Sequence, residues 1–345
     1  MLRPFGTNTE YIPQCKAVLD ASNNPYAQHF AASSLVRLLT ENTLSSQVGT
    51  QRAARAGRPA ADARLASCAS TCGTMCSPTW RARARRWRAL SPPVRASAPA
   101  QRPAACRGSQ RASRCAALIQ LLVRATKIGW FDGDAQQGIV KDVVTFLSQP
   151  SSSVYLLGLK ILNALVMEMN TPSGGYSLIV QRKTAVSFRD TALLSIFNIG
   201  LTSLRQLHEG GSATLPGSDE RLTEAAVNLV LKSLSFDFVG TSLDESAEDL
   251  GTIQVPSSWR PALEEPRTMA LLLSTYASAA PPLSCACLES LVRLASVRRS
   301  LFAAESERSA FLARLLRGTA DILRARTGLS EHANYHEFCR LLGRL

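Results

Sequence analysis

The sequence predicts an all-α fold, an α-solenoid of HEAT-like helical hairpins that is interrupted by one Arg/Ala-rich low-complexity segment. Apolar residues recur at helical spacing along most of the 345 residues, and no long window alternates as a strand would. Hydrophobic residues make up 46% of the chain but aromatic residues only 6%, a balance that favours Ala- and Leu-rich helices over sheets. Helical pairs recur roughly every 40 to 60 residues, near the spacing of HEAT units.

Residues 1–44 are expected to form partial N-terminal helical repeats. Asn23, Asn24 and Pro25 mark a turn, because these residue types favour turn conformations and end helices. Apolar positions on both sides of the turn, among them Phe30, recur at helical spacing. The region from 11 to 44 therefore predicts one helical hairpin.

Residues 45–115 break the helical pattern. Between Gln51 and Cys115 there are 14 arginines, no lysine and a single acid, Asp62, while the remaining 25 basic and 25 acidic residues of the chain cancel. The formal charge of +13 thus belongs to this segment alone. Low hydrophobicity with high net charge predicts disorder, and the Arg, Ala and Pro bias is equally expected of a gene-model artefact, a stretch read in the wrong frame.

Residues 116–345 are expected to form the solenoid. Leu118, Leu121, Leu122 and Ala125 stand at i, i+3, i+4 and i+7, which predicts an amphipathic helix. The same spacing predicts further helices near 136–147, 162–169, 184–207, 220–236, 268–276, 288–297, 311–323 and 335–342. The last of these is expected to leave Phe338, Leu341 and Leu342 uncovered, as in an array that continues.

One stretch among these helices, residues 237–263, reads as a long acidic loop. It holds four carboxylates within six positions, those of Asp244, Glu245, Glu248 and Asp249. A long charged loop set between helices is typical either of a packed surface loop or of a binding loop. In the binding interpretation the carboxylates meet a basic surface on a partner, where complementary charge speeds and orients association.

No enzyme motif, cofactor motif or metal site is predicted. His332, His336 and Cys339 are spaced so that one helix could present all three, but Asn334 and Tyr335 indicate a helix that begins between the histidines. No phosphate-binding loop or nucleophile elbow is present. No apolar run reaches the roughly 18 residues of a membrane span. The scattered cysteines indicate free thiols in a reducing compartment.

Four sequence blocks resemble one known family. They are SFDFVGTSLDES and IQVPSSWR in the acidic loop, ASVRRSLF at 295–302 and NYHEFCRLLGRL at 334–345, supported by KIGWFD at 127–132 and SFRD at 187–190. Together they resemble the exportin-7 group of Ran-binding nuclear transport receptors, in the importin-β (karyopherin) superfamily. Family members are much longer, so the resemblance implies an N-terminal fragment.

The resemblance implies a nuclear export receptor that binds RanGTP and protein cargo, contacts the Phe-Gly repeats of the nuclear pore, and shuttles between nucleus and cytoplasm without catalysis. Two alternatives remain open. The Arg-rich arm 51–115, with Trp80 and Trp87, has the composition of a nucleic-acid-binding segment. Periodicity alone indicates only a generic helical-repeat scaffold.

Overall fold

The computed structural model describes residues 11–22, 24, 26–38, 104–131, 134–149, 151–172, 178–209, 220–238 and 252–345, with the backbone only over 104–111 and 134–135. Within these residues the chain is helical and contains no β-strand, apart from one isolated bridge between Ile253 and Val297. The predicted all-α fold class is therefore confirmed.

The chain divides into two compact units, Met1–Asp142 with Met167–Thr184, and Val143–Val166 with Ala185–Leu345. Helices α7, α8 and α9 contribute residues to both. In chain order the elements are α1 (Ile12–Ala21), a helical stretch over 26–38, α5 (Ala104–Ile128), α6 (Asp134–Gln137), α7 (Ile139–Leu147), α8 (Ser152–Asn170), α9 (Leu178–Phe188), the π-helical turn η4 (Arg189–Leu193), α10 (Leu194–His208), α11 (Glu220–Leu234), the 3-10 turn η5 (Ser257–Trp259), α12 (Arg260–Glu264), α13 (Pro266–Ser278), α14 (Leu283–Ala295), the 3-10 turn η6 (Arg299–Leu301), α15 (Glu305–Ala325) and α16 (His332–Leu342).

The first unit is built on a helical hairpin. Helix α1 and the stretch 26–38 are joined through a turn in which the side chain of Asn24 accepts a hydrogen bond from the Tyr26 amide. Their apolar faces pack on α5, so that Leu35 and Leu121 share one core, each 1% exposed. Helix α5 begins at Ala104, so the end of the Arg-rich segment is helical, in keeping with its Ala and Arg content. Residues 45–103 lie outside the described residues.

A buried ion network holds α5 against the end of α8 in this unit. The carboxylate of Glu168, 7% exposed, lies 2.8 Å from Arg124 Nη1 and 3.9 Å from Lys127 Nζ. Lys127 Nζ also donates to the carbonyls of Glu168 and Thr171, at 2.7 and 2.5 Å. Burial lowers the pKa of Lys127 to about 8, and the nearby Glu168 carboxylate opposes that shift. The lysine thus neutralises the negative end of α8.

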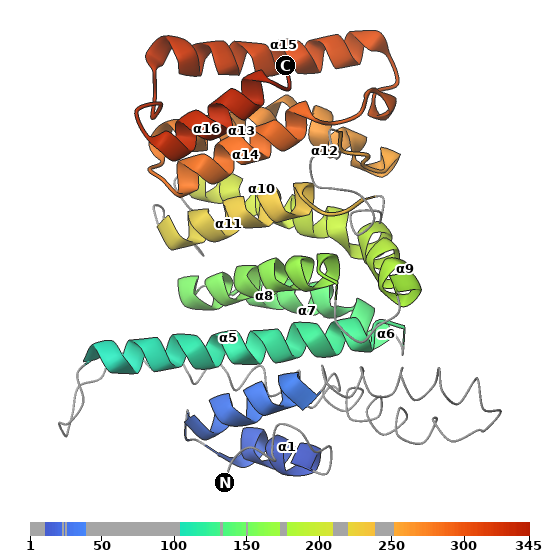
Figure 1. The fold of residues 1–345 in the computed structure, drawn as a ribbon, viewed down its shortest axis with the longest axis vertical. Helices are drawn as coiled ribbons and strands as arrows, with labels where there is room; N and C mark the ends of the chain where they lie inside the picture. The colour runs from blue at the N-terminus through green and yellow to red at the C-terminus, as the bar shows by residue number, and fades with distance from the viewer. Residues whose placement is uncertain are drawn as a thin grey trace. The chain divides into compact units, whose positions relative to one another are not determined.

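The second unit is a stack of helical pairs, as expected for an α-solenoid (Figure 1). Helix α10 packs on α11, and α13 packs on α14. Helix α11 contacts α14, which in turn contacts α16, while α13 contacts α15, so successive pairs lie one on another. Each pair leaves an apolar face for the next, which is how repeat proteins build a continuous core.

Helix α10 shows why the sequence folds this way. Its apolar stripe is buried: Ile196 and Phe197 are 0% exposed, and Leu204 is 1% exposed. Gly200 lies on the same stripe. A Cβ at this position would lie 3.0 Å from Val230 Cγ2, closer than side chains normally pack. The glycine therefore lets α10 and α11 approach closely.

Helix α16 differs from its prediction in two respects. It begins at His332, not between the two histidines, because Glu331 takes the extended N-cap conformation. Phe338 and Leu341 are buried, 2% and 0% exposed, so the prediction that they are uncovered was wrong. The α14 helix, earlier in the chain, covers them. Leu342 is exposed as predicted.

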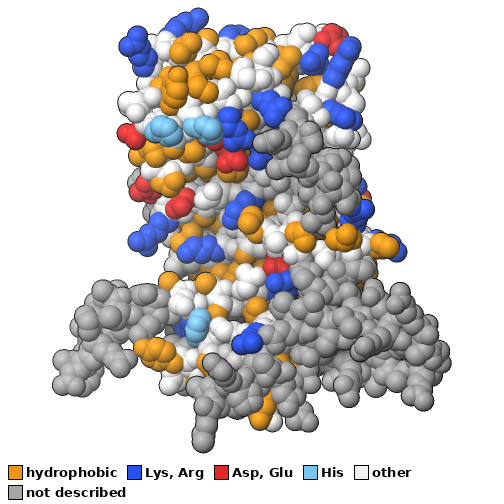
Figure 2. Space-filling model, viewed as in Figure 1, with side chains coloured by type: hydrophobic (Ala, Val, Ile, Leu, Met, Phe, Trp, Pro, Cys, Tyr) orange, Lys and Arg blue, Asp and Glu red, His pale blue; other side chains and the backbone are white. Residues whose placement is uncertain are grey.

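Apolar side chains nevertheless remain exposed on the last two helices, α15 and α16. Leu316 and Leu323 of α15 are 52% and 54% exposed, and Tyr335 of α16 is 56% exposed. Figure 2 shows hydrophobic side chains gathered at this end of the second unit. These two helices pack on the preceding pair, α15 mainly on α13 and α16 on α14.

Helix α8 is longer and more apolar than the sequence pattern indicated. By length and composition alone, Ser152–Asn170 is sufficient to cross a membrane, so the statement that no run reaches that length was too strict. More than half of the helix is buried by other parts of the chain, with Leu159 and Leu162 0% exposed. Asn163 also donates to the carbonyl of Ala225 in α11, at 2.8 Å. These contacts are those of a core helix.

Candidate interaction loop and its anchor

The four carboxylates predicted to contact a partner, those of Asp244, Glu245, Glu248 and Asp249, lie outside the described residues. The structure describes both ends of the acidic loop, up to Phe238 on one side and from residue 252 on the other. Those ends are built from the sequence blocks that resemble the family. We refer to their buried contacts together as the loop anchor, defined by Phe188, Phe197, Phe236, Phe238 and Trp259.

The centre of the loop anchor is a run of aromatic contacts. The ring of Trp259 lies 5.0 Å from that of Phe197 and 5.2 Å from that of Phe238, the latter edge to face. Phe236 lies 6.1 Å from Phe238 and 5.8 Å from Phe188. All five side chains are at most 4% exposed. Aromatic pairs at such distances contribute about 0.5–1.5 kcal/mol each beyond simple burial.

Arg189 fixes the point at which the loop leaves the helical stack. Its Nη1 donates to the Phe238 carbonyl at 2.5 Å, while its Nε and Nη2 bind the Asp190 carboxylate at 2.7 and 3.1 Å. Arg189 begins the π-helical turn between α9 and α10. Such turns occur often at functional sites, since the extra residue redirects neighbouring side chains.

The returning end of the loop is held by backbone pairing. The Ile253 amide donates to Ser296 at 2.7 Å, and the Arg298 amide donates to Ile253 at 3.0 Å. The IQVP sequence thus begins with a parallel bridge to Val297. The helix predicted near 288–297 ends at Ala295, before this bridge. Two distant family-like blocks are therefore joined directly.

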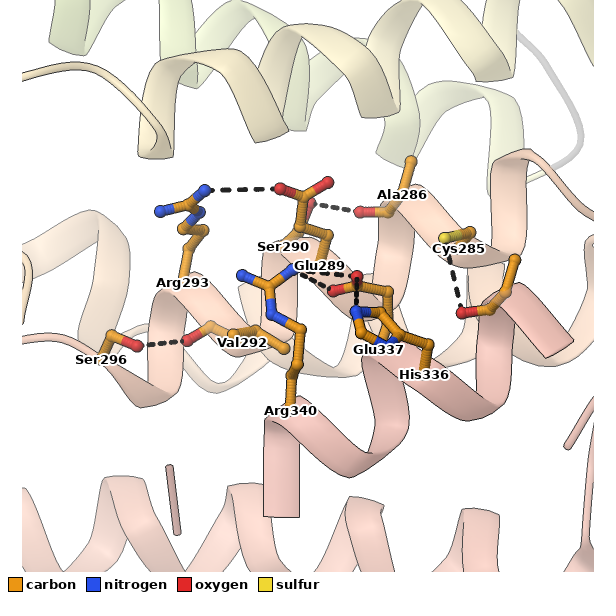
Figure 3. A network of polar contacts seen from close by, with 11 residues as sticks. Cys285, Ala286, Glu289, Ser290, Val292, Arg293, Ser296, His336, Glu337 and Arg340 are labelled. Atoms are coloured by element: carbon orange, nitrogen blue, oxygen red, sulfur yellow. Dashed lines mark hydrogen bonds and ion pairs between the residues drawn. The ribbon is translucent and has the colours of Figure 1, made fainter. Parts of the chain in front are cut away.

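Polar contacts run along α14 and α16, and Cys285 Sγ of α14 donates to the Ala333 carbonyl of α16 at 3.8 Å (Figure 3). Glu337, 7% exposed, accepts two hydrogen bonds from Arg340 at 2.9 and 2.7 Å, and His336 Nε2 lies 3.8 Å from its Oε1. Asn334 Oδ1 accepts a hydrogen bond from Ser284 at 2.9 Å, and Asn334 Nδ2 donates to Gly328. The hydrogen bonds of Ser284 and Cys285 fix the last helix on α14, whereas the contacts of Glu337 lie within α16.

The histidines considered as metal ligands do not gather. Among the described residues no group of three or more His, Cys, Asp or Glu side chains is placed to hold a metal ion. The described cysteines are free thiols. Burial raises the pKa of Cys287 to about 12, which disfavours a reactive thiolate.

The loop anchor was missed by sequence reasoning as a site, although Phe188, Phe236, Phe238 and Trp259 fall within the family-like blocks. Phe188 and Trp259 are far apart in sequence, and helical periodicity reports only contacts within one element. The available signal was the order of the family-like blocks, since four of them meet at this anchor or at the bridge beside it.

Comparison with known proteins links the chain to nuclear transport receptors. It is 42% identical over 233 residues to Exportin-7-A of Xenopus laevis, which covers 66% of this chain and 21% of that protein. It is 40% identical over 233 residues to Ran-binding protein 17 of Homo sapiens, with the same coverage, and 40% over 238 residues to Ran-binding protein 16 of Drosophila melanogaster, covering 66% and 22%. This part of the chain is exportin-7-like.

The similarity covers two thirds of this chain but only a small part of each relative. The chain spans about a fifth of the length of the curated relatives it matches. No family model matches the chain. The relatives are named as exportins and Ran-binding proteins rather than as enzymes, which fits the absence of predicted catalytic motifs in the sequence.

Proposed function

We propose that the chain acts in nuclear export, as a receptor that binds Ran in its GTP form together with a protein cargo. The observation that supports this most is the similarity of 40–42% to exportin-7 and Ran-binding proteins over two thirds of the chain. The stacked helical pairs agree with it, because such stacks present extended surfaces to partner proteins. The same proposal includes contact with Phe-Gly repeats of the pore and shuttling between nucleus and cytoplasm.

Within this proposal the acidic loop contacts a basic surface of Ran or cargo through Asp244, Glu245, Glu248 and Asp249. The support is that the described residues at both ends of the loop are anchored in buried structure, which fixes where the chain leaves and rejoins the helical stack. Complementary charges at such a loop mainly raise the association rate, and salt screens them.

The experiment is a binding assay of the full chain with Ran loaded with a non-hydrolysable GTP analogue or with GDP. The proposal expects a clear preference for the GTP form. A quadruple variant, Asp244→Asn, Glu245→Gln, Glu248→Gln and Asp249→Asn, should slow association at low salt. The matched control neutralises four exposed acids elsewhere, Glu209, Glu220, Glu224 and Asp321, and should leave the rate nearly unchanged.

The results separate two questions. Equal binding to both nucleotide forms, or none, would count against the receptor function. A nucleotide preference that survives the quadruple variant with an unchanged association rate would keep the receptor function but remove the acidic loop from it.

A second candidate, binding of nucleic acid through the Arg-rich arm, rests on the 14 arginines between Gln51 and Cys115. Binding of single-stranded RNA that falls steeply with salt, and that is lost when 51–103 is deleted, would favour it. Because helix α5 starts at Ala104, the deletion should stop before that residue.

A further inference from the structure

The second unit contains a groove that neither the sequence motifs nor the proposed export function assigns. Its volume is about 770 Å³, and it lies between α7, the start of α8 and the outer face of α10. Val144 and Leu147 of α7 form an apolar wall. Tyr155 of α8 lies beneath, with its hydroxyl 2.7 Å from that of Ser203, so this buried pair is already satisfied.

The other side of the groove is a continuous polar stripe. Thr191, Ser195, Asn198, Thr202 and Gln206 all line it, and they follow one another at steps of three or four residues. That spacing places them on one face of the helix. All but the partly buried Gln206 are exposed.

The side chains of four members of the stripe, Ser195, Asn198, Thr202 and Gln206, make no hydrogen bond with any other described residue. Several other hydroxyl side chains in these helices do form hydrogen bonds. Ser203, for example, donates to the Ile199 carbonyl four residues earlier, at 2.8 Å. The donors and acceptors of the stripe are thus available to a ligand.

The spacing of the stripe suits an extended peptide. At about 1.5 Å of rise per helical residue, Asn198 and Gln206 are about 12 Å apart along α10, close to four residues of extended chain at about 3.3 Å each. An amide side chain both donates and accepts, so each can bind the N–H and the C=O of peptide backbone. The whole stripe, about 22 Å long, matches about seven extended residues.

The charge of the groove limits which peptide fits. None of its lining residues is Lys, Arg or His, and its only ionisable acid is Asp190, whose side chain is 49% exposed while paired with Arg189. The carbonyl end of α7 also reaches the groove at Ser148, and a helix C-terminus carries partial negative charge. An acidic peptide is therefore disfavoured, and a basic side chain is favoured beside Asp190.

We propose that this groove binds an extended segment of a partner protein, uncharged along most of its length, with a basic side chain next to Asp190. Asn198, Thr202 and Gln206 hold the backbone of the segment, and the wall of Val144 and Leu147 excludes water from one side. The groove has one carboxylate, that of Asp190, whereas the acidic loop has four. Its test does not depend on Ran.

The probe is a displayed library of random peptides about nine residues long, slightly longer than the groove, selected on the full 345-residue chain. The selected peptides should be enriched in Lys or Arg and depleted in Asp and Glu. Their affinity for an Asn198→Ala/Gln206→Ala variant should fall at least about tenfold, since two bidentate contacts are lost. Asp190→Asn should cost about threefold and weaken the salt dependence.

Matched controls keep the test specific. Ser306→Ala/Ser309→Ala removes two exposed hydroxyls from α15, and Asp321→Asn removes a carboxylate that pairs with a nearby arginine as Asp190 does. Neither should alter binding. Thr202→Arg, at an exposed helical position, should block the groove while circular dichroism stays unchanged. Failure to select any peptide, enrichment of acidic peptides, or equal binding by the double variant would overturn the proposal.

Discussion

The two units fix chain segments by opposite chemistry. In the first, a buried network of Glu168, Arg124 and Lys127 binds the end of α8. In the second, the loop anchor holds the acidic loop with five aromatic rings and a single arginine contact to the backbone. Ion networks respond to pH and to the loss of one charge, whereas aromatic clusters respond to loss of volume. The comparison therefore predicts different sensitivities for the two units.

The largest expected effect is on the loop anchor. Trp259→Ala should reduce the free energy of unfolding by about 4 kcal/mol, because it removes a fully buried ring and leaves a cavity. Urea unfolding followed by circular dichroism measures this. Tyr335→Ala, at a side chain that is 56% exposed, is the control and should change stability little. A similar loss in both variants would show that the aromatic cluster has no special role.

The corresponding change in the first unit is Glu168→Gln. It removes the carboxylate that pairs with the partly buried Arg124 and the buried Lys127, which should cost about 3 kcal/mol. Adding Lys127→Met should recover part of the loss, because one uncompensated charge is then removed. If the double variant loses the full sum of the two single changes, the network is not coupled.

The pH dependence of stability should separate the units further. Lys127 has a pKa of about 8 in the folded chain, below its ordinary value of 10.5. The unfolded chain therefore binds more protons between these values, and stability should rise with pH in that window by about 1–3 kcal/mol. Subtracting the profile of Lys127→Met isolates this contribution. The subtraction also cancels the contribution of Cys287, whose raised pKa makes stability fall as pH rises. A flat difference would contradict the assignment.

The smallest expected effect concerns Arg189. Arg189→Met removes the hydrogen bond to the Phe238 carbonyl but keeps an apolar stem, and should cost about 1–2 kcal/mol. Hydrogen exchange should increase at the described ends of the acidic loop, around Phe238 and Ile253, and not in α5. An unchanged exchange pattern at those ends would mean that the aromatic rings alone hold the loop.

The sequence predicted what depends on local periodicity. The helical spacing predicted near 184–207 is found in α9, η4 and α10, whose apolar residues Ile196, Phe197 and Leu204 are buried. Contacts between distant segments could not be predicted in this way. The pairing of Lys127 with the end of α8, the bridge from Ile253 to Val297 and the burial of Phe338 all depend on the order in which helices stack.

The candidate sites show the same division. The acidic residues Asp244, Glu245, Glu248 and Asp249 stood out by composition, and their role stays a prediction because they lie outside the described residues. The groove beside α10 did not stand out, since Asn198 and Gln206 are ordinary surface residues in a sequence. They form a site only because the wall from α7 lies opposite them.

The most direct test of the proposed export function is the ratio of two dissociation constants, measured by fluorescence anisotropy for the full chain with Ran bound to a non-hydrolysable GTP analogue and with Ran bound to GDP. The account predicts binding to the GTP form that is tighter by at least about tenfold, a difference of about 1.4 kcal/mol. Equal dissociation constants, or no binding to either form, would contradict it.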